Sequence, residues 1–459
     1  MEAKLNTRLL SALLSAAVLV TACKKEDDDE PTDSGTDPRE FTVTTSGDVS
    51  TVEGNSDVSY TFTSDKTWVL KGFVYVESGA TLTIEPGTVV RGDKDTKGTL
   101  IIKRGAMIMA EGTASEPIVF TSNQPVGSRA AGDWGGLIIC GKAKNNQPGG
   151  EATVEGGVEA TYGGTSDNDN SGILRYIRIE FPGIPFQPNQ EINGLTLASV
   201  GRGTTIDHVQ VSFSGDDSFE WFGGNVDVKY LVAYKGLDDD FDMDNGYSGR
   251  FQFGVAQREP NTADQSGSNG LEHDNDANGT TSEPFTTPVI SNVSIFGPKA
   301  DAGTSINSNF KRSNHLRRNA HTRVFNSLFA GFPVGCLIDG SACEANCDAN
   351  ELKVKNCVYG GMETLTAVAS GSTWDIATWF NNGGNTSYTT NAELGVTNGF
   401  DQDAPDFTLT GASPLNSGAD FSDGDLGASF FQSVNYRGAF GAENWTSGWC
   451  NWDPQNTAY

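Results

Sequence analysis

An internal repeat constrains the fold of this chain more than any other feature. The phrase from Ile206 to Gly224 recurs 22 positions later, from Val228 to Gly246, as a β-branched run followed by paired acids, an aromatic residue and further acids. Stacked coils of a solenoid produce such self-similarity, because each coil packs only on its neighbours. The repeat therefore predicts a solenoid with about 22 residues in each coil.

Short strand-like runs surround the repeat, such as Lys71–Val76 and Thr99–Ile102, and no amphipathic helix stands out beyond the N-terminus. Short strands also build sandwiches and barrels, but the regular spacing favours a solenoid. We predict an all-β chain that forms a right-handed parallel β-helix with long loops and a C-terminal cap. The expected segments are an N-terminal strand or cap segment over 41–66, the β-helix over 67–430 and a capping segment over 431–459, in which Trp445, Trp449 and Trp452 cover the last coil.

The N-terminus has the pattern of an export signal. Two basic residues precede an apolar stretch from Leu9 to Val20, which is too short to span a bilayer. Val20-Thr-Ala-Cys23 resembles a bacterial lipobox, in which the Cys is lipidated and becomes the first mature residue. We predict a signal peptide over 1–22, lipidation of Cys23 and an acidic flexible tether over 23–40.

The acids that follow Cys23 resemble an export signal that sends lipoproteins to the outer face of the outer membrane. The bland alternative is a solvated spacer. We expect a protein held at the outer membrane by its lipid anchor alone and facing the cell exterior.

The excess of acidic residues limits the kinds of partner that the protein can bind. The formal net charge of −28 would repel nucleic acid, so no nucleic-acid partner is expected. Much of this charge is concentrated between Ser214 and Gly246, inside the repeat. A divalent cation remains compatible with such a surface.

The repeat places the acids in register. Asp217 lies over Asp239 and Glu220 over Asp242, and Glu272 aligns with Asp242 one coil further on. Adjacent strands are about 4.8 Å apart, so stacked carboxylates repel unless a cation lies between them. Calcium, which takes oxygen ligands in loose geometry, is the expected cofactor. Its candidate ligands are Asp217, Glu220, Asp239, Asp240, Asp242, Asp244, Glu272, Asp274, Asp276 and Asn278.

The run Asp274-Asn-Asp-Ala-Asn-Gly279 matches the start of a calcium loop, although Phe285 stands where an EF-hand needs Glu. The alternative for this loop and for the stacked acids is solvated Asp and Asn turn chemistry.

Six of the seven cysteines remain after Cys23 is set aside. An even number in an oxidising compartment favours disulfides. Cys343 and Cys347 are the best local pair, and we predict a disulfide between them. A zinc cluster is the weaker alternative, because the spacing lacks Cys-x-x-Cys.

Several phrases carry a family resemblance. Val76–Gly87, Gly112–Ser122 and Asp133–Ile138, together with the ending Tyr436–Gly441, look like the pectin-lyase-like β-helix lipoproteins of glycan-using Gram-negative bacteria. The resemblance implies the β-helix fold, an extracellular polysaccharide as ligand and an outer-membrane transporter as a partner. It does not imply one activity, because members of this group are mostly uncharacterised.

The resemblance also suggests a reaction. Calcium-dependent pectate lyases with this fold hold the ion on clustered aspartates, and a Lys or Arg removes a proton from the uronate. Arg317 and Lys235 are the candidate catalytic bases, and Arg250 and Arg312 are candidate ligand contacts. Arg317 has a second interpretation as a charge partner for Glu272.

Parity separates the two aromatic residues inside the repeat. Trp221 shares the inward parity of Phe219, so we expect it in the core, while Phe222 points outward and is a candidate sugar contact. Our leading expectation is a surface calcium-binding protein that binds a polysaccharide. The alternatives are a calcium-dependent uronate lyase, less favourably a glycoside hydrolase, and an adhesin or structural partner in a surface complex.

Overall fold

The computed structural model describes residues 38–187 and 190–459. The predicted signal peptide, Cys23 and the tether up to residue 37 lie outside the described residues. The described part is built almost entirely of strands, with two short α-helices, α1 (Ser341–Asp348) and α2 (Ile376–Asn382). No helix in this part of the chain has the length and apolar character needed to cross a membrane.

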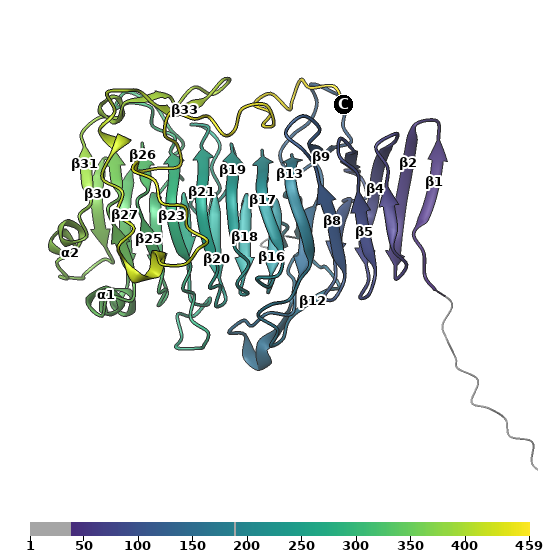
Figure 1. Ribbon diagram of the computed structural model, residues 1–459, viewed down its shortest axis with the longest axis horizontal. Coiled ribbons are helices and arrows are strands. Elements are labelled where there is room, and N and C mark those ends of the chain that lie inside the picture. Colours follow the sequence, from purple (N-terminus) through teal and green to yellow (C-terminus); the bar gives the residue numbers. More distant parts are fainter. Residues whose placement is uncertain (1–37, 188–189) are drawn as a thin grey trace, which may run out of the picture. The chain divides into compact units, whose positions relative to one another are not determined.

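Most strands pair in three parallel ladders that run along the stack of coils (Figure 1). Ladder A contains the C-terminal half of β4 (Thr67–Val76), then β7 (Thr99–Ile102), β10 (Gly136–Cys140), β16 (Leu195–Ala198), β18 (Phe219–Phe222), β20 (Phe241–Asp244), β22 (Leu271–His273), β24 (Arg312–Arg317), β27 (Val334–Asp339) and β30 (Thr364–Val368).

Ladder B contains β3 (Tyr60–Phe62), β5 (Thr81–Ile84), β8 (Met107–Glu111), the first halves of β13 (Gly172–Glu180), β17 (Thr205–Ser212), β19 (Val228–Tyr234), β21 (Arg250–Gln257) and β23 (Val289–Phe296), and then β25 (Arg323–Phe325) and β28 (Lys353–Lys355). Ladder C contains β2 (Val49–Ser56), the first half of β4, β6 (Val89–Gly92), β9 (Ile118–Ser122), the second halves of β13, β17, β19, β21 and β23, and then β26 (Leu328–Ala330), β29 (Val358–Gly360) and β31 (Thr386–Tyr388).

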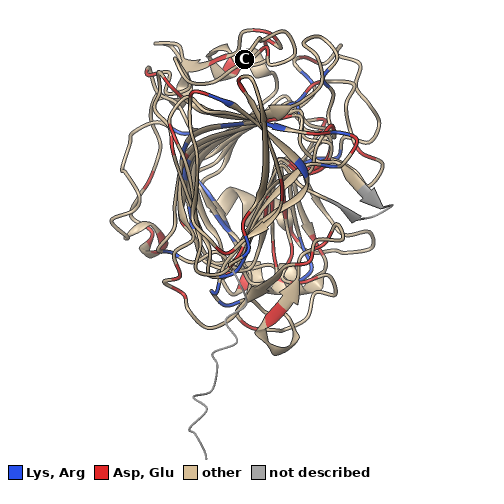
Figure 2. Ribbon diagram, turned by 90° about the vertical axis from the view of Figure 1, so that its right-hand side faces the viewer, with Lys and Arg blue, Asp and Glu red and all other residues tan. Residues whose placement is uncertain are grey.

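The three ladders form three walls around one core, as a view along the stack shows (Figure 2). This arrangement is a right-handed parallel β-helix, which confirms the predicted fold. Antiparallel pairs are found at its margins: β1 (Thr42–Ser46) with β2, β11 (Glu151–Thr153) with β12 (Thr161–Gly163), β14 (Pro185–Gln187) with β15 (Gln190–Glu191), and β32 (Val396–Asn398) with β33 (Asp406–Leu409).

The repeat seen in the sequence is the register of ladder A. Phe219 pairs with Phe241 and Trp221 with Met243, and all four side chains are fully buried. The Phe219 and Phe241 rings stack with centroids 5.5 Å apart. Since successive residues of a strand point to opposite faces, the acids between these apolar residues point out of the coil.

The long strands bend sharply where ladder B meets ladder C. One residue of each strand has a positive φ, which is rare for side chains other than Gly or Asn and turns the chain into the next wall. The aromatic rings at this corner stack, with centroids 4.4, 4.4 and 5.2 Å apart. Along the stack the corner residues are Tyr176, His208, Tyr230, Phe253, Asn292, Asn326 and Asn356.

Residues 389–459, here called the return segment, run back along this corner toward the first coils (Figure 1). Outward side chains of the coils hold the carbonyl groups of the segment: Asn326 donates to Asp420, Gln252 to Gln432, Asn292 to Tyr436, Gln210 to Asn451 and Arg129 to Pro454. Trp449 packs edge-on against His208, at 5.5 Å between ring centroids.

The position of the return segment differs from the prediction of a C-terminal cap. Residues 431–459, with Trp445, Trp449 and Trp452, were predicted to cap the last coil, but they cover the flank of the helix instead. Helix α2 lies at the last coils, with Ile376 and Phe380 buried in the core cluster. Trp445 and Trp449 pack on the stacked aromatic rings of this corner, and Trp452 packs on Tyr234.

The state of the cysteines also differs from the prediction. All six cysteines in the described part are free thiols, so the predicted disulfide between Cys343 and Cys347 is not formed. The two residues lie one turn apart on α1, and both are buried. Burial raises the pKa of the Cys343 thiol to about 12, which keeps it protonated and unreactive. The short loop expected to carry the disulfide is in fact this helix.

Candidate functional site

The acidic side chains of the repeat line one face of ladder A. Glu220 pairs in register with Asp242, and Asp242 with Glu272, as the sequence predicted. Three coils thus place three carboxylates above one another. Unscreened carboxylates at this spacing destabilise a sheet.

A second row of polar residues stands two positions before each strand. The backbone N–H of Asp239 donates to Asp217 Oδ1 at 2.8 Å, and that of Asn269 donates to Asp239 Oδ1 at 2.5 Å. Each carboxylate in this row therefore fixes the turn of the coil above it. Asp217 and Asp239 both line the same cavity.

The two rows border a cavity of about 380 Å³. Carboxylate oxygens come within 4.8 Å of one another in three groups: Asp216 with Asp217 and Asp238, Asp217 with Glu220 and Asp242, and Asp239 with Asp242 and Glu272. Asp242 belongs to two of the groups, and its Oδ1 is buried without a hydrogen-bond partner. The remaining lining residues are Glu155, Asn193, Ser266, Gly267, Arg312, Arg317 and Arg318.

Burial dominates the electrostatics of these acids. It raises the pKa of Asp217, Glu220, Asp239 and Asp242 well above the ordinary range, and the neighbouring carboxylates raise each pKa further. Burial also raises the pKa of Asp238, to about 6. Without a cation, these carboxyl groups therefore release their protons at a higher pH than exposed acids do.

One end of the cavity is basic. Arg317 forms an ion pair with Glu272 and a second one with Asp274 at 2.7 Å, and Arg318 pairs with Asp274 at 2.6 Å. His315 Nδ1 lies 2.9 Å from Glu272 Oε2. Burial alone would raise the pKa of Glu272, but the His315 hydrogen bond and the Arg317 charge bring it below its usual value.

Arg317 is thus a charge partner of Glu272. Although its own burial acts in the opposite direction, the bonds to Asp274 and Glu272 raise the pKa of the Arg317 guanidinium further above its usual value. A group that is bound by two carboxylates and held protonated is poorly suited to remove a proton. This geometry argues against the predicted role of Arg317 as a catalytic base.

Lys235, Arg250 and Phe222 do not line the acidic cavity. Lys235 borders another pocket, at the far side of a coil corner, and donates to the carbonyl of Gln402 at 2.6 Å. Arg250, on ladder B, is paired with Asp227. Phe222 points outward as predicted, but Tyr162 of the β11–β12 insertion stacks against it at 6.1 Å. Only Arg312 of the predicted ligand contacts lines the cavity.

Five of the predicted calcium ligands lie outside the three carboxylate groups. Asp240 forms a buried ion pair with Arg258 at 2.8 Å and does not reach the cavity. Asp274 is held by the two arginines, and Asp276 accepts the backbone N–H groups of Asn278 and Thr280 in a local turn. Asp244 stands outside the three carboxylate groups. The structure therefore brings together Asp217, Glu220, Asp239, Asp242 and Glu272, and arranges the 274–279 run as an Asx turn.

Several residues that line the acidic cavity were not predicted from the sequence. Asn193 stands two positions before Leu195, the place that Asp217 occupies before Phe219, so alignment of one further coil would have found it. Asp216 and Asp238 immediately precede the acids that were named. Glu155 comes from the insertion between β10 and β13, where no repeat marks it.

Fold and site together define a parallel β-helix with a carboxylate-rich cavity on one wall. A family model described as a pectate-lyase like beta helix domain matches residues 54–449. The chain therefore belongs to the pectate-lyase-like β-helix family, as the resemblance predicted. Searches of curated proteins and of solved structures gave no match.

Proposed function

We propose that this protein binds calcium in the acidic cavity of ladder A and uses the bound ion to hold an extracellular polysaccharide. The observation that supports calcium best is the convergence of Asp217, Glu220, Asp239, Asp242 and Glu272 from three successive coils. Calcium accepts six to eight oxygen ligands in flexible geometry, and a stack of carboxylates with neighbouring amide oxygens is the donor set that it prefers.

The unpartnered Asp242 Oδ1 is a test of this fit. A buried polar atom without a hydrogen bond is costly, and a neighbouring carboxylate cannot supply a donor unless it is protonated. A cation between the coils would satisfy Asp242 and remove the repulsion between Glu220, Asp242 and Glu272 together. When bound, the ion would supply positive charge for an acidic sugar.

Binding without cleavage is the favoured use of the site. Among the described residues that line the cavity, the basic side chains are Arg312, Arg317 and Arg318. Arg317 and Arg318 are engaged by carboxylates, so Arg312 is the better contact for an anionic ligand group. A calcium-dependent uronate lyase is the second candidate, because the family is described as pectate-lyase like.

The N-terminal sequence supports a proposal for the place of action. We propose that lipidation of Cys23 anchors the protein at the outer membrane with the β-helix on the exterior. Its expected partners are the polysaccharide and an outer-membrane transporter. Digestion of intact cells with an added protease, compared between cells that carry the parent protein and cells that carry the Cys23→Ser variant, would test this placement.

Calorimetry with calcium tests the ion. The purified protein should bind calcium, and Asp242→Asn should weaken binding by about tenfold or more, since it removes a charge shared by two carboxylate groups. Asp65→Asn, which changes an exposed acid outside the site, is the matched control and should leave the affinity unchanged. Equal affinity in the two variants, or no binding heat in the parent protein, would contradict the proposal.

Two measurements separate binding from cleavage. Binding to a panel of immobilised polysaccharides, with and without chelator, should show calcium-dependent retention. Absorbance of unsaturated products should stay flat on uronic polymers; a rise would establish the lyase instead. Absence of retention on every polysaccharide would favour an adhesin or a structural partner.

A further inference from the structure

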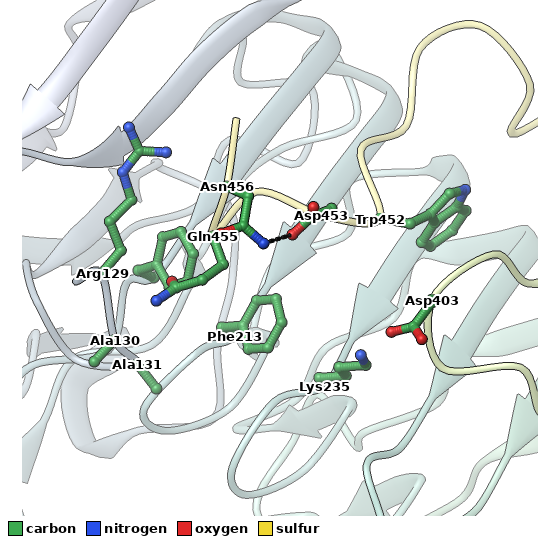
Figure 3. A pocket seen from close by; sticks show the side chains of 11 residues that line it. Arg129, Ala130, Ala131, Phe213, Lys235, Asp403, Trp452, Asp453, Gln455 and Asn456 are labelled. Carbon is green, nitrogen blue, oxygen red and sulfur yellow. Dashed lines mark hydrogen bonds between the residues drawn. The ribbon is translucent and has the colours of Figure 1, made fainter. Parts of the chain in front are cut away.

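A second cavity, of about 490 Å³, lies on the flank of the β-helix and shares no lining residue with the acidic one (Figure 3). Pockets that hold small ligands have volumes of about 300–1,000 Å³. Its floor is formed by the corner after ladder C, and its roof by the return segment. The lining residues are Arg129, Ala130, Ala131, Phe181, Phe213, Lys235, Asp403, Trp452, Asp453, Gln455 and Asn456.

The floor repeats one unusual backbone conformation. Phe181, Phe213 and Lys235 follow register partners on β13, β17 and β19, and their φ angles are +61°, +54° and +55°. A left-handed conformation costs about 1–2 kcal/mol for a residue with a Cβ. Bulky side chains at three successive corners are therefore not explained by the turn, which Gly or Asn would make with less strain.

The other aromatic corner provides a comparison. At the corner between ladders B and C, Trp445 and Trp449 cover the rings of Tyr230 and His208. At the present corner the return segment leaves space above Phe213, whose ring stands in the middle of the cavity (Figure 3). The buried Phe181 ring stacks against Phe213 at 5.3 Å between centroids, and the Lys235 ammonium lies over the Phe213 ring, 5.7 Å from its centroid.

Polar groups surround the aromatic floor. The carboxylates of Asp403 and Asp453 and the amides of Gln455 and Asn456 come from the return segment (Figure 3). Asn456 Nδ2 donates to Asp453 Oδ1 at 2.8 Å, which orients that carboxylate. An aromatic face beside acids and amides suits a sugar ring, whose C–H face packs on the ring while its hydroxyls donate to the carboxylates.

The charge of the rim distinguishes between sugars. Arg129 is engaged by the carbonyls of Pro454 and Thr457, at 2.7 and 2.9 Å. Lys235 is engaged in the same way by the carbonyl of Gln402, at 2.6 Å. The two cations and the carboxylates of Asp403 and Asp453 balance in charge, so the rim has no excess positive charge to attract an anionic sugar.

We propose that this flank pocket is a second binding site, for a neutral sugar residue of a polysaccharide. The part of the Phe213 ring that lines the cavity provides the apolar contact, and Asp403 and Asp453 accept hydrogen bonds from the sugar hydroxyls. Binding at this pocket needs no cation, so it does not rest on the calcium proposal.

Calorimetry on the full mature chain in excess chelator tests the pocket, with cellohexaose, xylohexaose and mannohexaose as neutral probes and trigalacturonate as the anionic one. At least one neutral probe should bind. Phe213→Ala should weaken that binding by about tenfold or more, as expected for a central aromatic anchor. Phe222→Ala, which changes another outward aromatic residue outside this pocket, and Asp65→Asn, which changes an exposed acid, should leave the affinity unchanged.

Other outcomes would overturn the proposal. These are the absence of binding by all three neutral probes, unchanged affinity in Phe213→Ala, dependence on calcium, or preference for trigalacturonate. Should Phe213→Ala lower the melting temperature, Asp403→Asn replaces it, because Asp403 is exposed and its loss should weaken neutral-sugar binding without unfolding the chain.

Discussion

Neighbouring acids of the repeat have opposite environments. Asp239 faces the acidic cavity and accepts a backbone N–H of the next coil, whereas the side chain of Asp240 is fully buried with Arg258. Burial raises the pKa of Asp240 to about 6, against the effect of the Arg258 charge. One of these two adjacent residues thus lines the acidic cavity, and the other stabilises the packing of a corner.

Asp240→Asn should destabilise the protein by about 3–5 kcal/mol, because it leaves the Arg258 charge buried without its partner. Urea denaturation would measure this loss. Glu53→Gln breaks the exposed pair of Glu53 with Lys71 and should cost less than about 1 kcal/mol. Equal losses in the two variants would show that the buried pair has no special role.

Sequence periodicity predicted the residues that repeat and not those that sit at corners. Glu220, Asp242 and Glu272 were placed in register because strand parity and coil length fix them. Asp240 was misplaced because the direction of a turn residue depends on local φ and on a partner 18 positions away. Phe222 failed as a contact for a similar reason, since the Tyr162 ring that covers it comes from an insertion without a repeat.

At the scale of elements, the return segment is the main departure from a simple stack. Trp449 is almost completely buried against Tyr176 and His208, and its carbonyl accepts a hydrogen bond from Arg178. The segment completes a second apolar cluster outside the coils, which contains Phe296, Phe407 and Trp449. No periodicity marks residues 389–459, so the sequence separated only 431–459 from the predicted β-helix and did not predict the path of the segment.

Trp449→Ala should reduce the free energy of unfolding by about 3–5 kcal/mol, the usual loss for a buried Trp or Phe. Trp374→Ala is the control: this residue is only half-buried near α2, so its loss should be smaller. Chemical denaturation followed by circular dichroism would compare them. A larger effect at Trp374 would indicate that the segment contributes little to the stability of the fold.

At the scale of the whole molecule, the acid excess behind the net charge of −28 makes the stability of the fold depend on pH. Burial raises the pKa of Asp238 to about 6 and that of Asp244 to about 7, from 3.8 for an ordinary Asp. Protons on these groups favour the folded state. Their contribution is complete below about pH 4 and is lost as the pH rises through 6 and 7.

In excess chelator, the melting temperature should therefore fall between about pH 5 and pH 8. Calcium should raise it most at pH 8, where the carboxylates are ionised and need the cation. Scanning fluorimetry over this range would measure both effects, and Asp242→Asn should flatten the dependence on pH. A melting temperature that rises with pH in chelator would contradict the assignment of these acids.

The return segment also affects how the molecule is expected to unfold. Coils of a solenoid normally interact only with their neighbours, so the ends can open while the middle stays folded. Here Arg91 on ladder C donates to the carbonyl of Tyr459, a contact between positions 368 residues apart. Opening of an early coil must break contacts with the end of the chain, which couples local fraying to global unfolding and favours a single cooperative transition.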